Sequence, residues 1–145
     1  MTKRIKIGQL DPAFYTMLTA LDQHIAESGL TTTQLDLLKI RASQLNGCAY
    51  CIQVHTKEAR AHGESEKRIY ALDAWEESPY FTNAEQALLV LTEEVTLIRD
   101  KRVSDETYER VVALFGEKQT ATLIMAIISI NAWNRIGIAT RMTPT

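Results

Sequence analysis

The spacing of helix starts, apolar residues and helix stops constrains the fold of this chain more than any other feature. Asp11 and Pro12 supply an N-cap acceptor followed by proline at the first helical position. Thr82 and Glu85 have the spacing of a capping box, and Gly29 follows a predicted last turn. Between such signals apolar residues recur every three or four positions, and no convincing alternating run indicates a strand. The sequence therefore predicts an all-α fold, a compact bundle of about six to seven helices.

Two of the predicted helices matter most for function. One runs from about Cys48 to His62, directly after a turn or helix break at Asn46-Gly47. The last helix runs from about residue 117 to 141, after a stop at Gly116, and is apolar on nearly every face between Ala121 and Ile130. A helix of this kind must be covered on several sides, by the centre of a bundle or by another subunit.

Length and charge exclude several classes of protein. The 145 residues fit one domain, 1–145, and 46% of them are hydrophobic, as in ordinary globular proteins. A formal charge of −2 gives no long-range attraction for nucleic acid or anionic membranes. No apolar run of signal-peptide length precedes Asp11, and the Ala121 to Ile130 stretch is about half of a membrane span. We expect a cytoplasmic protein that binds neither nucleic acid nor membrane.

Chemistry is indicated by the spacing of Cys48, Cys51 and His55. These residues stand three and four positions apart, so that a helix places all three side chains on one face. The helix N-terminus near Cys48 and the imidazole of His55 could each favour a thiolate, the reactive form of cysteine. A second cysteine within reach lets an oxidised thiolate condense to a disulfide, which thiol exchange can then reduce.

Other interpretations of the same residues remain open. The two cysteines could be small buried residues, or they could bind zinc together with His55, with Asp36 or water as a fourth ligand. A c-type haem site fails because Ile52 follows the second cysteine, and a thioredoxin-like motif lacks its βαβ context. Asp36 could orient His55 or only favour its own helix N-terminus, and spacing alone favours the second role. His24 and His62 are expected to be structural.

A longer motif resembles a known family. The segment from Arg41, RASQLNGCAYCIQVHTKEA, is similar to the signature of the AhpD-like alkylhydroperoxidase branch of the carboxymuconolactone decarboxylase superfamily. The later segments FTxxExALxxLTE from Phe81 and INAWNR from Ile130 resemble that branch too. The resemblance covers most of the chain. It implies an AhpD-like helical fold that assembles into trimers or hexamers.

The resemblance also implies roles for individual residues. Cys51 would attack a hydroperoxide, Cys48 would resolve the product, and His55 would belong to a proton relay. Asp36 stands where the family relay uses a glutamate, and Tyr50 stands where some members have a second histidine. The implied function is a thiol-dependent alkylhydroperoxide reductase in antioxidant defence, which needs an external dithiol reductant and no cofactor or metal. The alternatives are a redox-sensing or binding oligomer without peroxidase activity and a cofactor-free decarboxylase of the same superfamily.

Overall fold

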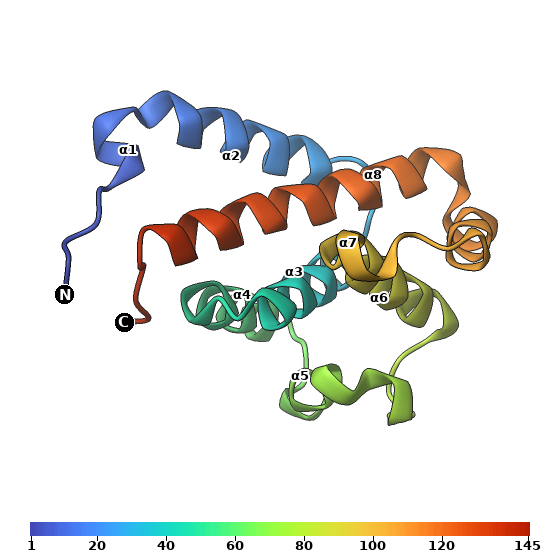
Figure 1. Ribbon diagram of the computed structural model, residues 1–145. Helices are drawn as coiled ribbons and strands as arrows, with labels where there is room; N and C mark the ends of the chain where they lie inside the picture. The colour runs from blue at the N-terminus through green and yellow to red at the C-terminus, as the bar shows by residue number, and fades with distance from the viewer.

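The computed structural model describes residues 1–145, and all of its regular structure is helical (Figure 1). The predicted all-α fold is confirmed, but there are eight α-helices instead of about six to seven, because the short α1 and α7 were not predicted. The elements in chain order are α1 (Ile7–Leu10), α2 (Pro12–Ala26), α3 (Thr32–Asn46), α4 (Ala49–Ala61), α5 (Glu66–Ala71), the 3₁₀ segment η1 (Leu72–Glu77), α6 (Asn83–Thr96), α7 (Ile98–Lys101) and α8 (Asp105–Ala139).

Helix starts follow the capping residues of the sequence. The Asp11 carboxylate accepts a hydrogen bond from the backbone N–H of Ala13, and Pro12 is the first residue of α2. At the start of α6, Thr82 and Glu85 form the predicted capping box with reciprocal hydrogen bonds of 3.2 and 2.8 Å. The Ser104 hydroxyl caps α8 by accepting a hydrogen bond from the backbone N–H of Thr107. The predicted starts at Asp11 and Thr82 are confirmed, because each depends only on groups within one turn.

Helix ends have simple geometric causes. α6 ends at Thr96 because the chain leaves helical geometry at Leu97, before the short α7. Gly116 has φ 75° and ψ 163°, so the predicted stop is present as a kink between two helical parts of α8. Figure 1 shows the chain turning sharply at this point, at the orange end of α8.

The long part of α8 lies at the centre of the molecule. It contacts α2, α3, α4 and α6, which cover the side that carries Leu123, Ile127 and Ile130. By length and composition alone α8 could cross a membrane, and in this structure it packs against four other helices of the protein. Met125 and Ile128 face outward and are 41% and 46% exposed. The helix is thus covered from several sides but not from all.

A polar network joins α3 to α8 inside the apolar core. Asn46 Nδ2 donates hydrogen bonds of 2.9 Å to the side-chain oxygens of Asn131 and Asn134. Asn134, which is fully buried, donates in turn to the Ser43 hydroxyl at 3.0 Å. Each buried polar side chain in the network has a partner, so the network avoids the desolvation cost of unpaired groups.

A buried ion pair connects α3 with α6. Arg41 lies 3.0 Å from Glu93, and the indole N–H of Trp75 donates to the same carboxylate at 2.8 Å. Burial alone would raise the pKa of Glu93, but the hydrogen bond from Trp75 and the charge of Arg41 outweigh it and hold this pKa below its ordinary value. Glu93 therefore stays ionised inside the protein.

Candidate active site

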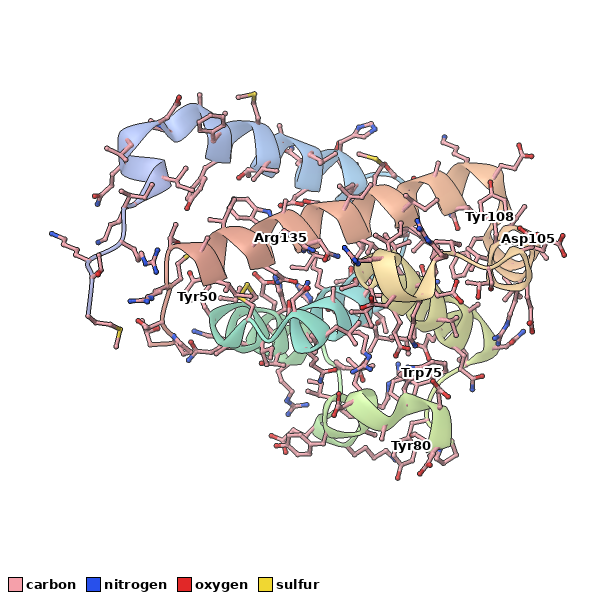
Figure 2. The ribbon with its side chains drawn as sticks, in the orientation of Figure 1. Tyr50, Trp75, Tyr80, Asp105, Tyr108 and Arg135 are labelled. Atoms are coloured by element: carbon pink, nitrogen blue, oxygen red, sulfur yellow. A yellow bond between two sulfur atoms is a disulfide. The ribbon has the colours of Figure 1, made fainter.

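Cys48 and Cys51 form a disulfide at the start of α4. Gly47, with φ 68°, ends α3 in the left-handed conformation and turns the chain into Cys48. Cys48 is the N-cap of α4, and its sulfur accepts a hydrogen bond from the Cys51 backbone N–H at 3.3 Å. Both residues are buried, with 2% and 4% exposure. Figure 2 shows the yellow sulfur bond beside Tyr50, between α4 and α8.

Gly137 of α8 makes room for the two sulfur atoms. A Cβ atom at this position would lie 3.1 Å from Cys48 Sγ and 3.5 Å from Cys51 Sγ. The shorter distance is below nearly all ordinary Cβ contacts, so a larger residue could not occupy the position without displacing its neighbours. The close approach of the α8 backbone therefore depends on glycine.

An apolar pocket of about 300 Å³ opens beside the disulfide. Cys51 and His55 both line it, whereas Cys48 does not. Its walls are mainly aliphatic and aromatic and include Ile130 and Trp133 of α8. The volume is at the lower end of the range for small-molecule sites. The predicted cluster of a thiol pair and a base is therefore brought together, and Cys51 is the sulfur that faces the free space.

His55 is oriented by Glu58, one turn along α4. The Nδ1 atom of His55 lies 2.9 Å from Glu58 Oε2, an arrangement that fits an Nδ1–H donor and leaves Nε2 as an acceptor. Burial is the largest influence on His55 and lowers its pKa below the ordinary 6.5; Lys39 adds to this effect, while Glu58 and Asp36 oppose it. His55 is therefore a neutral base at pH 7.

Asp36 does not contact His55 through a hydrogen bond but pairs with His62. Its Oδ2 atom lies 2.7 Å from His62 Nδ1, and Asp36 is 3% exposed while the His62 side chain is 47% exposed. Asp36 acts on His55 only through its charge. The carboxylate that orients His55 is thus Glu58, a residue that the sequence motif contains but that spacing did not single out.

No cluster of three or more His, Cys, Asp or Glu side chains is placed to hold a metal ion. The zinc set considered from the sequence needed Cys48, Cys51, His55 and a fourth group such as Asp36. The two sulfurs are instead bonded to each other, and Asp36 is bonded to His62. The arrangement suits thiol and disulfide chemistry.

Two further polar residues of the pocket, Asp22 and Lys39, were not identified from the sequence. Asp22 of α2 accepts hydrogen bonds from the Trp133 indole N–H, at 2.8 Å, and from the Ser129 hydroxyl. Trp133 also packs edge to face against Tyr15, with ring centroids 5.2 Å apart. Lys39 of α3 lines the pocket together with Cys51 and His55.

The pairing of Asp22 needs tertiary structure, whereas Lys39 could have been found from helix periodicity. Asp22 and Trp133 are separated by 111 positions, so no local pattern pairs them. Lys39 lies one turn after Asp36 on α3, a helix whose most evident sequence feature is its buried leucines. A helical-wheel projection would have placed it on the same face as Asp36.

Comparison with known proteins places the chain in a family. The sequence model of the carboxymuconolactone decarboxylase family matches residues 12–94. An uncharacterised Bacillus subtilis protein, YdfG, is 42% identical over 139 residues, which cover 96% of this chain and 95% of YdfG.

Solved structures agree with this placement. A protein of unknown function from Agrobacterium tumefaciens, described as a candidate antioxidant defence protein AhpD, has a TM-score of 0.94 at 35% identity, covering 99% of both chains. The debrominase Bmp8 shares the fold, with a TM-score of 0.84 at 16% identity over 94% of this chain and 74% of that one. From its sequence and its AhpD-like structure, the chain belongs to the carboxymuconolactone decarboxylase family.

Proposed function

We propose that the protein is a thiol-dependent hydroperoxide reductase of antioxidant defence, in which Cys51 reacts with the peroxide. The observation that carries the proposal is the apolar pocket in which the Cys51 sulfur and the neutral His55 base meet. The AhpD-like description of the Agrobacterium relative, which is similar over its whole length, supports it.

Cys51 is the better candidate for attack because it lines the pocket and Cys48 does not. In the reduced protein, His55 accepts the thiol proton of Cys51 and leaves a thiolate. Lys39, in the same pocket, stabilises that thiolate by its charge. A hydroperoxide lying against the apolar wall can then approach the sulfur without passing through bulk water.

The reaction balances in three steps. The thiolate attacks the terminal peroxide oxygen, the O–O bond breaks, and Cys51 becomes a sulfenic acid while the alkoxide takes the proton from His55 and leaves as an alcohol. The Cys48 thiol then attacks the sulfenic sulfur, which releases water and forms the Cys48–Cys51 disulfide. An external dithiol reduces this disulfide by exchange and is itself oxidised. One hydroperoxide and one dithiol therefore give one alcohol, one water and one disulfide.

The N-cap position of Cys48 suits the reduction step. The incoming thiolate would attack Cys51, the sulfur that faces the pocket, and Cys48 would leave as a thiolate. That leaving group is stabilised by the Cys51 backbone N–H and by the positive end of α4. The exposure of Cys51 to the pocket thus serves both the reaction with peroxide and the reduction of the disulfide.

Asp36 has an indirect role in the proposed relay. Held by His62, it adds to the effect of Glu58 in opposing the lowering of the His55 pKa, although its charge is the smallest of the influences on this base. Asp36 therefore acts on His55 through its charge and does not carry a proton itself. The proposal further includes assembly of a homo-oligomer, a trimer or hexamer in the cytoplasm, for which the exposed Met125 and Ile128 of α8 are candidate contacts.

The test uses pre-reduced protein mixed with cumene hydroperoxide, with loss of peroxide and gain of alcohol followed by chromatography. Cys51→Ser should abolish consumption. Cys48→Ser should consume one equivalent and leave a sulfenic acid that dimedone traps, which mass spectrometry can locate on Cys51. Unchanged consumption in Cys51→Ser would overturn the proposal.

The same proteins separate the alternatives. A redox-sensing oligomer would change size between its reduced and oxidised forms in light scattering and show no peroxide turnover. A cofactor-free decarboxylase would keep its activity in Cys48→Ser/Cys51→Ser. Either result would replace the peroxidase assignment.

A further inference from the structure

A second cavity of about 670 Å³ adjoins the apolar pocket. The two share three lining residues, Tyr15, Tyr50 and Met142, so the cavities lie side by side, and we call the larger one the vestibule. Figure 1 shows both chain termini at this end of the molecule, and the vestibule is lined by segments close to each of them. A ligand beside Cys51 that extends past these three side chains therefore enters the vestibule.

The vestibule is cationic in a protein that is slightly acidic. It is lined by four basic residues and by no acidic residue: Lys3, Arg4, Lys6 and Arg141. None of the four belongs to a salt bridge of the structure. With a formal charge of −2 over the whole chain, such a group of unpaired cations is a local departure from the average.

Arg141 occupies a backbone position that normally takes glycine. Its φ of 54° lies in the left-handed region, just after the end of α8. The N–H of Arg141 bonds to Ile138 O and that of Met142 to Gly137 O, the pattern of a Schellman motif with arginine at the position where glycine is usual. Holding a non-glycine residue there costs about 1 kcal/mol or more. The strain is explained if the guanidinium has a function in the vestibule.

The walls of the vestibule are held in place from both ends of the chain. A Cβ at Gly8 would lie 2.9 Å from the Tyr15 ring, so α1 packs closely on this aromatic side chain. At the other end, the side chain of Gln53 on α4 exchanges two hydrogen bonds with the backbone of Thr145, at 2.6 and 3.0 Å. Tyr15 and the C-terminal segment therefore have defined positions around the opening.

We propose that the substrates are organic hydroperoxides that carry a carboxylate, with the apolar body in the pocket beside Cys51 and the carboxylate in the cationic vestibule. This rests on the proposed peroxidase function and names its substrate class. Carboxylate is complementary to unpaired Arg and Lys side chains, and the mainly aliphatic and aromatic walls of the pocket suit the apolar body of the substrate. Hydrogen peroxide has neither an apolar body nor a charge and gains from neither feature.

The test compares two substrates that differ only in charge, cumene hydroperoxide with a para-carboxylate and with a para-carboxamide. The expected kcat/KM ratio of carboxylate to carboxamide is about tenfold at low salt, since several exposed cations each contribute a factor of up to about five. In 0.5 M NaCl the ratio should fall, because exposed charges are screened.

Arg141→Gly removes one cation while giving the backbone the residue that its conformation favours, so the variant should fold. The kcat/KM ratio should fall several-fold in Arg141→Gly and approach one when Lys3→Gln and Lys6→Gln are added. Lys118→Gln is the matched control and should keep the wild-type ratio, because this exposed lysine lies near the kink at Gly116, at the end of the long part of α8 that is remote from the vestibule. A ratio near one in the wild type, or an unchanged ratio in the triple variant, would overturn the proposal.

Binding of two unreactive probes separates this inference from the peroxidase function. Calorimetry should show that 4-isopropylbenzoate binds the reduced protein more tightly than 4-isopropylbenzamide, with the preference lost in the triple variant. Peroxide turnover with equal probe binding would leave the peroxidase intact and refute the carboxylate site. Preferential binding of the benzoate without turnover of either hydroperoxide would refute the peroxidase function and, with it, this substrate class.

Discussion

The contact between Gly137 and the sulfur atoms leads to a quantitative prediction for Gly137→Ala. The added Cβ would lie 3.1 Å from Cys48 Sγ, whereas ordinary contacts begin at 3.4 Å, so α8 or the disulfide must shift by a few tenths of an ångström. Overpacking of this kind costs about 1–3 kcal/mol. Alanine in a helix interior is in turn favoured over glycine by about 1 kcal/mol. The net destabilisation expected is therefore about 0–2 kcal/mol.

A double-mutant cycle isolates the contact. In Cys48→Ala the sulfur is absent, so adding Gly137→Ala should there stabilise the protein by about 1 kcal/mol through helix propensity alone. Thermal unfolding followed by circular dichroism can resolve the difference, because 1 kcal/mol corresponds to a few degrees in a protein of this size. The coupling energy between positions 48 and 137 should be about 1–3 kcal/mol. Equal effects of Gly137→Ala with and without the Cys48 sulfur would refute the steric argument.

Three other predictions concern titration and buried polar groups. Peroxide reactivity should hold as the pH falls through 6.5 and decline only below the lowered pKa of His55; Glu58→Gln should move this decline to lower pH and Lys39→Met to higher pH, as stopped-flow rates would report. Because the pKa of Glu93 is depressed, its contribution to stability is full above its ordinary value of 4.5 and is lost as the pH falls through the depressed value; Glu93→Gln should flatten this part of a stability–pH curve from urea unfolding. Asn134→Ala leaves Asn46 and Ser43 short of a partner and should cost about 1–3 kcal/mol, with no measurable loss refuting the network's contribution.

The sequence predicted the elements whose causes are local. The N-caps at Asp11 and Thr82 depend on side chains within three residues of the helix start, and both are present. The grouping of Cys48, Cys51 and His55 was predictable for the same reason, since a single helix sets their spacing. Local rules therefore identified the thiol pair and the base.

What the sequence did not reveal depends on contacts between distant segments. The partner of Asp36 is His62, 26 positions away, and the partner of Asp22 is Trp133. The orienting role of Glu58 was local but remained hidden, because glutamate one turn after histidine is common on exposed helix faces. The vestibule joins residues near both ends of the chain, and no periodicity predicts that meeting.

The asparagine network in the core determines how α8 is rotated about its own axis. Aliphatic side chains alone would tolerate rotation of a smooth apolar helix about its axis, because leucine and isoleucine can repack. Asn134 fits at only one rotational setting, since advancing the helix by one residue would bring the Arg135 guanidinium into its place. The same rotation would replace Gly137 by Ile138 against the sulfur atoms, where not even a single methyl group fits at ordinary contact distance. The hydrogen bonds of Asn134 thus fix the rotation of α8 about its axis. They thereby place Gly137, one turn further along the helix, against the two cysteine sulfurs.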